Sequence, residues 1–170
     1  MEYLIFFRLI HIVCAVIWTG GMIYYAAFVI PAARTMGPDG ARFLQGLLRT
    51  NKLPIIMNVS AILTIVTGIY LMNKLLGGFQ LALFNSVHGA LIVIGSLLAL
   101  TGFIIGIGVN LPAAKRMSTI GKSLTVTGTP PTSGQFAELQ KLRKRSFAAS
   151  NFIAVLLFAS LILMSMVKYV

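Results

Sequence analysis

Histidine is the residue type in this sequence that most readily holds a metal, and the chain has two, His11 and His88. Both lie in long apolar stretches. Ionisable side chains inside a membrane span are energetically costly, so they usually face a partner or a functional site. Neutral imidazole is a good ligand for iron, and helix bundles build cofactor sites from side chains on facing helices. The pair therefore predicts one b-type haem held between His11 and His88 as its two axial ligands.

The two imidazoles are expected at similar depth. If the first and third apolar stretches are parallel helices, each histidine lies about two turns inside the outer end, roughly 10 Å at about 1.5 Å per residue. Arg8 precedes His11 by three residues, on the same face and nearer the aqueous surface, where it could pair with a haem propionate. Small residues on the same faces leave space for a flat macrocycle: Ala15, Gly89 and Gly95.

The same residues allow two other interpretations. A copper site would combine His11 with Cys14, three residues later, and with methionines in the apolar stretches, because thiolate and thioether ligands suit Cu(I). These methionines are Met22, Met164 and Met166. In a cofactor-free structural subunit, the histidines would only hydrogen-bond neighbouring helices, and Arg8 would extend its side chain to the membrane surface.

Composition identifies the class of protein that must position these residues. The 170 residues are 58% hydrophobic and 10% charged, with a mean hydropathy of +0.92, whereas about a quarter of a soluble domain is charged. A helix needs roughly 20 apolar residues to cross a bilayer. Four stretches qualify, which predicts one all-α domain over 1–170, an up-down-up-down four-helix membrane bundle. The stretches are 3–30, 53–72, 81–109 and 147–167.

The net charge of +11 is placed unevenly along the chain. Eleven of the 14 basic residues fall in the two long connections, 31–52 and 110–146. Cytoplasmic loops carry an excess of Lys and Arg, so both connections are expected in the cytoplasm, with both termini outside. The bilayer, and not nucleic acid, is the expected partner of this charge. The residues are Arg34, Arg42, Arg49, Lys52, Lys115, Arg116, Lys122, Lys141, Arg143, Lys144 and Arg145.

The two halves of the chain resemble each other. "VIPAAR" at Val29–Arg34 has a counterpart in "NLPAAKR" at Asn110–Arg116, and each half continues to an asparagine before an apolar stretch, Asn58 and Asn151. The spacing from histidine to proline is 20 residues in the first half and 24 in the second, a difference of about one helical turn. This pattern indicates two repeated helical hairpins in the same orientation.

The first stretch also resembles known bacterial membrane proteins. His11, Trp18, Gly21 and Tyr24 form the pattern H-x6-W-x2-G-x2-Y, which is similar to the first helix of HemJ-type protoporphyrinogen oxidases, small four-helix proteins that bind haem b. With Gly20, the pattern is equally similar to the CopD family of copper-resistance proteins. The resemblance implies a four-helix bundle in the bacterial cytoplasmic membrane, with His11 as a haem or metal ligand. It does not carry the oxidase activity, because the Pro-Arg segment and the third-helix lysine of HemJ proteins are absent.

A haem with two histidine ligands has no open coordination position, which favours an electron carrier over an enzyme. Near the outer face, such a haem would exchange electrons with quinol or with a periplasmic carrier. The protein would act alone, as a homo-oligomer, or as a subunit of a larger redox complex.

Overall fold

The computed structural model describes residues 2–50, 53–77, 81–127 and 132–169, and these contain helices and no strand. The first half comprises α1 (Glu2–Tyr24), a π-helical turn η1 (Tyr25–Val29), α2 (Ile30–Thr35), α3 (Gly37–Thr50) and α4 (Leu53–Leu76). The second half comprises a 3₁₀ turn η2 (Leu81–Asn85), α5 (Val87–Ile105), a π-helical turn η3 (Gly106–Asn110), α6 (Leu111–Thr127), α7 (Ser133–Met166) and η4 (Val167–Tyr169).

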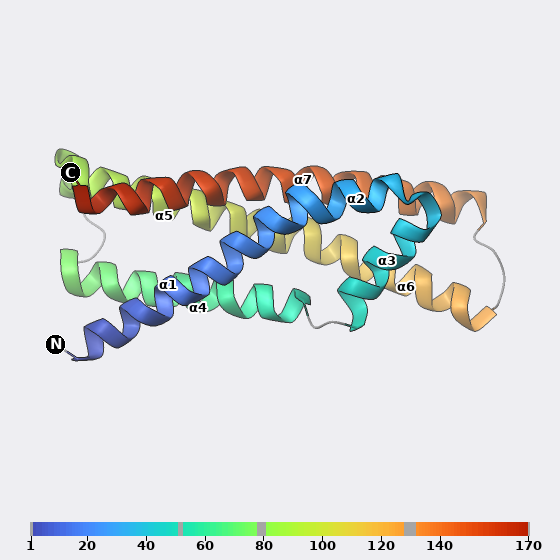
Figure 1. Cartoon of the computed structure of the whole chain (residues 1–170), viewed down its shortest axis with the longest axis horizontal. Coiled ribbons are helices and arrows are strands. Elements are labelled where there is room, and N and C mark those ends of the chain that lie inside the picture. Colours follow the sequence, from blue (N-terminus) through green and yellow to red (C-terminus); the bar gives the residue numbers. More distant parts are fainter. Residues whose placement is uncertain (1, 51–52, 78–80, 128–131, 170) are drawn as a thin grey trace.

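The predicted all-α, up-down-up-down bundle is confirmed. In Figure 1, α1 and α5 run in one direction, and α4 and α7 run in the other. Helix α1 packs mainly against α4, and α5 packs mainly against α7, which also contacts α1. The bundle therefore consists of two helical hairpins joined through α1 and α7.

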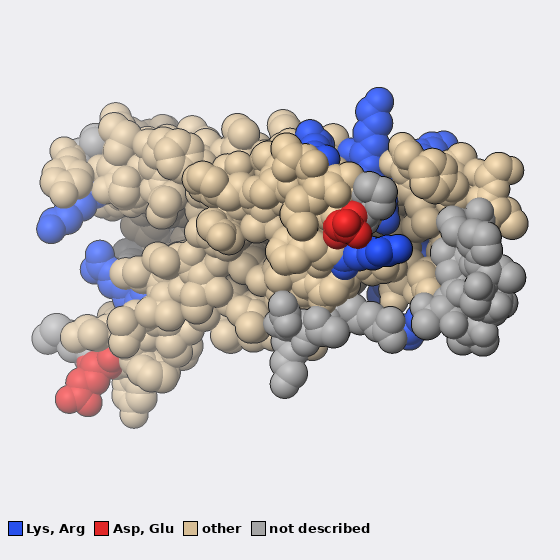
Figure 2. Space-filling view, turned by 45° about the vertical axis from the view of Figure 1, so that its right-hand side comes forward, with Lys and Arg blue, Asp and Glu red and all other residues tan. Residues whose placement is uncertain are grey.

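The helices have the length and surface of membrane-spanning segments. Four are long and apolar enough to cross a bilayer: Glu2–Thr35, Leu53–Lys74, Val87–Ser123 and Ser133–Tyr169. Many large apolar side chains lie exposed on them, such as Ile5, Val66, Ile104 and Val155. Figure 2 shows basic side chains at one end and in the opposite half of the molecule, separated by a broad uncharged band. An uncharged band between charged ends is the surface that a multi-pass membrane protein presents to lipid.

Both halves interrupt their first long helix in the same way. Pro31 and Pro112 have no backbone N–H and therefore cannot continue an α-helical ladder. Just before each proline the helix widens into a π turn, in which Ile30 N–H donates to the Tyr25 carbonyl and Leu111 N–H donates to the Gly106 carbonyl. The two turns stand at the same distance from their prolines, which supports the predicted repeat.

The two connections expected as loops are largely helical. Residues 31–52 contain most of α2 and all of α3, and residues 110–146 contain α6 and the first four turns of α7. Helix α3 folds back on α2, where Gly40 lies against the backbone of Ala33. Helix α7 begins outside the apolar stretch because Thr132 and Gln135 form a capping box. Lys52, in the first connection, and residues 128–131, in the second, lie outside the described residues.

The third membrane helix begins later than predicted. Residues Leu81–Asn85 form a separate 3₁₀ turn, and α5 starts at Val87 after Ser86, whose side chain accepts a hydrogen bond from Gly89 N–H. This cap sets the helix start, although the sequence is apolar on both sides of it. His88 consequently lies in the first turn of α5, not two turns inside the helix.

The core lies where the hairpins meet. Trp18, Ala61, Ile153 and Leu157 form the buried apolar cluster, and the Trp18 ring meets Phe103 edge-on at 6.2 Å between centroids. Trp18 lines two separate cavities. One cavity contains His11, and the other adjoins the two π turns.

Candidate functional site

His11 is held in a single orientation by α4. Its Nδ1 lies 2.9 Å from the Thr64 carbonyl oxygen and 3.2 Å from Thr67 Oγ1. A carbonyl oxygen only accepts hydrogen bonds, so Nδ1 carries the proton and Nε2 keeps its lone pair. A metal-binding histidine commonly donates its other ring N–H in this way, which fixes the tautomer and the ring orientation. His11 therefore has the arrangement of a ligand with Nε2 available.

The surface of α4 is shaped to receive the imidazole. A Cβ atom built on Gly68 would lie 2.9 Å from His11 Cε1 and 3.3 Å from Nδ1, so the ring packs directly on the glycine. The hydroxyl groups of Thr64 and Thr67 donate to the carbonyls of Ser60 and Leu63 in their own helix, at 2.8 and 2.6 Å. Because both hydroxyl protons are used within α4, neither threonine donates a hydrogen bond to Nδ1. This is consistent with a proton on Nδ1 itself.

His11 lines a cavity of about 440 Å³ with walls from α1, α4, α5 and α7. This volume lies within the range of small-molecule and cofactor sites, roughly 300–1,000 Å³. The lining is mostly apolar, with a few hydroxyl groups, and includes Ala15, Met72, Val93, Ser96, Leu161 and Met164. The cavity suits a flat and largely apolar group that is bound through one imidazole.

His88 lies elsewhere. It is exposed in the first turn of α5 and does not line the cavity of His11. When the halves are matched at Pro31 and Pro112, the position equivalent to His11 is Ile92. The spacing from histidine to proline differs by about one helical turn between the halves, and the π turns do not offset this difference because both halves contain the same one. The structure therefore does not bring the two histidines into one cavity.

Of the other residues expected near the cofactor, some lie at the cavity of His11 and some do not. Arg8 is exposed, one turn from His11 towards the start of α1. Ala15 lines the cavity as expected. A Cβ on Gly95 would lie 3.2 Å from the Met164 methyl carbon, so the small residue makes room for a cavity side chain. Gly89 instead lies against the backbone of Leu83.

Met164 lines the same cavity as His11, but the other residues of the copper interpretation are dispersed. Cys14 is buried but does not line the cavity of His11. Met22 lines the other cavity, and Met166 is exposed. Within the described part of the chain, no three residues among His, Cys, Asp and Glu are grouped to hold a metal ion.

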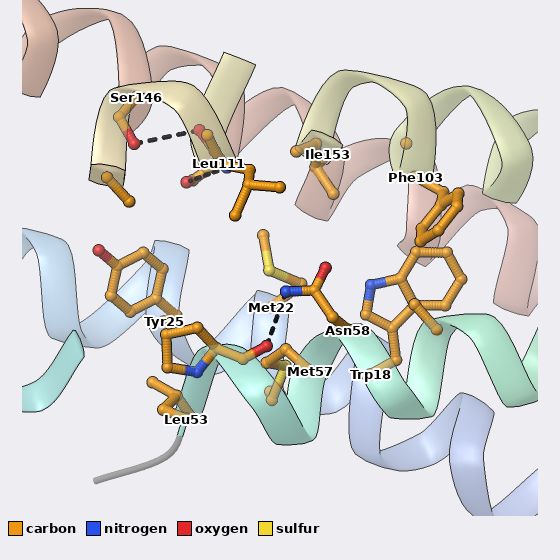
Figure 3. Close-up of a pocket in the computed structure, with 18 of the residues that line it drawn as sticks. Trp18, Met22, Tyr25, Leu53, Met57, Asn58, Phe103, Leu111, Ser146 and Ile153 are labelled. Atoms are coloured by element: carbon orange, nitrogen blue, oxygen red, sulfur yellow. Dashed lines mark hydrogen bonds between the residues drawn. The ribbon is translucent and has the colours of Figure 1, made fainter. Parts of the chain in front are cut away.

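The cavity beside the π turns was not expected from the sequence. It measures about 150 Å³ and is shown in Figure 3 with Trp18, Tyr25 and Asn58 around it. On its α7 side, Asn110 Nδ2 donates to Ser150 Oγ at 3.1 Å, and Ser146 Oγ donates to Asn110 Oδ1 at 3.0 Å. The signals for it were asparagines inside apolar sequence and the seven-residue step from Trp18 to Tyr25, which place polar groups towards the bundle interior.

No known protein family, curated protein or solved structure matches the chain. Its function is therefore argued from its own residues.

The contact between His11 and α4 gives a stability prediction. Replacing Gly68 with alanine forces the imidazole away and breaks its hydrogen bond to Thr64, a loss of about 1–3 kcal/mol. At roughly 2–4 °C per kcal/mol for a chain of this size, the thermal midpoint of the detergent-solubilised protein should fall by several degrees. The matched control is Gly20→Ala, since a Cβ on Gly20 meets nothing within 4 Å. Equal midpoints for the two variants would contradict this account of His11.

Proposed function

We propose that this protein is a membrane b-type cytochrome that transfers electrons through one haem bound at His11. The observation that carries the proposal is the His11 ring, whose Nδ1–H is held by the Thr64 carbonyl at 2.9 Å while the side chain lines an apolar cavity of about 440 Å³. The haem would supply one-electron chemistry. The protein would supply the ligand, exclude water and hold the ring plane between four helices.

If a haem is bound, Met164 and not His88 would supply the second iron ligand. Met164 lines the same cavity as His11 from α7, whereas His88 is exposed and outside that cavity. A histidine and a methionine are an established ligand pair for haem iron, and this pair raises the reduction potential of the haem. Arg8 is assigned to a propionate, because it lies one turn nearer the outer end of α1.

The proposed location is the bacterial cytoplasmic membrane, with both termini outside. The basic residues of α3, α6 and the start of α7 support this orientation through the excess of Lys and Arg on cytoplasmic segments. His11 lies in the outer half of the bundle in this arrangement. Quinol or a periplasmic carrier is the proposed electron donor or acceptor, with the protein acting alone, as a homo-oligomer or within a larger complex.

An absorption spectrum of the purified protein tests the haem. We expect a Soret band that sharpens and shifts on reduction, and we expect His11→Ala to abolish it because the iron loses its anchored ligand. Met164→Leu should convert the low-spin spectrum to a high-spin one, since leucine keeps the volume and removes the sulfur. His88→Ala should leave the spectrum unchanged.

Three results would contradict this assignment. A low-spin spectrum retained in Met164→Leu but lost in His88→Ala would return the second position to His88. Stoichiometric copper without iron would favour the copper-handling alternative. Protein purified without any metal or haem from haem-replete cells would favour the structural subunit.

The orientation is tested at two positions along the last span. Lys141 lies in α7 and Lys168 lies in η4, directly after the end of α7. Both are exposed, and the native Cys14 is buried. In intact cells, a membrane-impermeant thiol reagent should label Lys168→Cys and spare Lys141→Cys until the cells are broken. The reverse pattern would invert the proposed topology.

A further inference from the structure

We propose that the cavity beside the π turns binds the ring of a membrane quinone. This site is separate from the cavity of His11, and the proposal does not depend on a haem there. It rests on unpaired polar groups that face the cavity, on the size of the cavity, and on its lack of charge.

Trp18 presents a donor to the cavity without a protein acceptor. Its side chain is 5% exposed, and its indole N–H makes no hydrogen bond to any residue that the structure describes. In Figure 3 this nitrogen points across the cavity in the direction of Asn58. A molecule the size of water reaches this nitrogen, since no fully buried side-chain N or O atom of the described residues lacks a hydrogen-bond partner, so the donor is open to a partner outside the protein. A ligand with an acceptor oxygen would provide that partner.

Asn58 and Tyr25 add polar groups of complementary kinds. Asn58 Nδ2 donates to the Pro54 carbonyl at 2.7 Å, which leaves Oδ1 as an acceptor at the cavity. The Tyr25 hydroxyl lies at the opposite end of the cavity from the Trp18 indole (Figure 3). A quinone carbonyl accepts from an N–H or O–H, and the hydroxyl of its reduced form donates to an amide oxygen. The set therefore suits both oxidation states.

The size of the cavity fits one six-membered ring. Its volume of about 150 Å³ equals that of a cavity known to hold benzene, about 150 Å³. Trp18 and Tyr25 are seven residues apart, which is about 10 Å along a helix, and they lie at the two ends of the cavity. Aromatic and thioether side chains complete the walls: Met22, Met57 and Phe103.

The charge and position of the cavity select the class of ligand. Among the described residues, no lysine, arginine, aspartate or glutamate lines it, so a charged headgroup would lose its hydration without gaining a counter-charge from them. An uncharged ligand dissolved in the bilayer meets no such penalty. Helices α4 and α5 contact each other only slightly, which leaves a side of the bundle through which an isoprenoid tail can reach the lipid.

The two π turns converge on this cavity. Tyr25 comes from η1, while Gly106 and Asn110 come from η3, and all three line the cavity. Single π turns inside longer helices occur frequently at functional sites. Here, both turns in the described chain meet at the same cavity, although they lie about 80 residues apart in the sequence.

The single tryptophan of the chain provides a direct test. The full-length His11→Ala protein, free of haem, is placed in nanodiscs and titrated with decylubiquinone while tryptophan fluorescence is recorded. Quinones quench indole at contact, so we expect quenching that saturates. Tyr25→Phe removes one hydrogen bond and should raise the dissociation constant about fivefold. Tyr24→Phe is the matched control, because Tyr24 is 63% exposed and does not line the cavity, and it should leave the constant unchanged.

Equilibrium dialysis of decylubiquinone against the wild-type protein checks the result without fluorescence. Trp18→Phe keeps an aromatic ring and removes the N–H, so we expect about fivefold weaker binding. Quenching that rises linearly, as for free N-acetyl-tryptophanamide in the same nanodiscs, would overturn the proposal. Equal dissociation constants for wild type, Tyr25→Phe and Trp18→Phe would also overturn it. Loss of the haem spectrum in His11→Ala bears on the haem alone, so the two proposals can fail separately.

Discussion

The fold depends on the requirement that every backbone polar group inside a bilayer finds a partner within the protein. Pro31 and Pro112 break that rule locally, since a proline supplies no N–H. A π turn precedes each proline. In it, the N–H of Ile30 or Leu111 donates to the carbonyl five residues earlier, where an α-helix would use the carbonyl four residues earlier. The extra residue in each turn changes which side chains face inward. Both cavity-lining turns therefore follow from the two prolines.

Polar contacts between helices hold each hairpin together at equivalent positions. Thr67 and Ser160 each lie nine residues after the asparagine that marks their half. Thr67 Oγ1 meets the His11 ring at 3.2 Å, and Ser160 Oγ donates to the Gly95 carbonyl at 2.7 Å. Interhelical hydrogen bonds and small residues are the usual means of association in membranes, where the hydrophobic effect no longer distinguishes a helix from lipid. In the first hairpin, the neighbouring Thr64 carbonyl also accepts from Nδ1–H and so fixes the tautomer of His11.

The features that depend on composition, namely the spans and the helix order, could be predicted from the sequence. The exact helix ends, which depend on local capping, and the cavities, which depend on packing, could not. Four apolar stretches were enough for the spans and for the order of the helices. The start of the third span was wrong because the apolar sequence continues through Ser86, and only its side-chain bond to Gly89 N–H shows where the α-helix begins. That error placed His88 too deep in the helix. Helices α3 and α6 were missed because a search for apolar stretches does not detect amphipathic segments such as α3.

The cavity of Trp18 and Tyr25 could not be predicted, because it depends on which faces of four helices meet. Its position nevertheless follows a simple spacing along α1 and η1. His11, Trp18 and Tyr25 succeed one another at intervals of seven residues, which drift by only about 20° per interval around a straight helix. One inward face therefore carries an imidazole, an indole and a phenol in order of depth. Trp18, packed on Phe103 in the core, is the one of the three that lines both cavities, so a change in either cavity acts on a shared side chain.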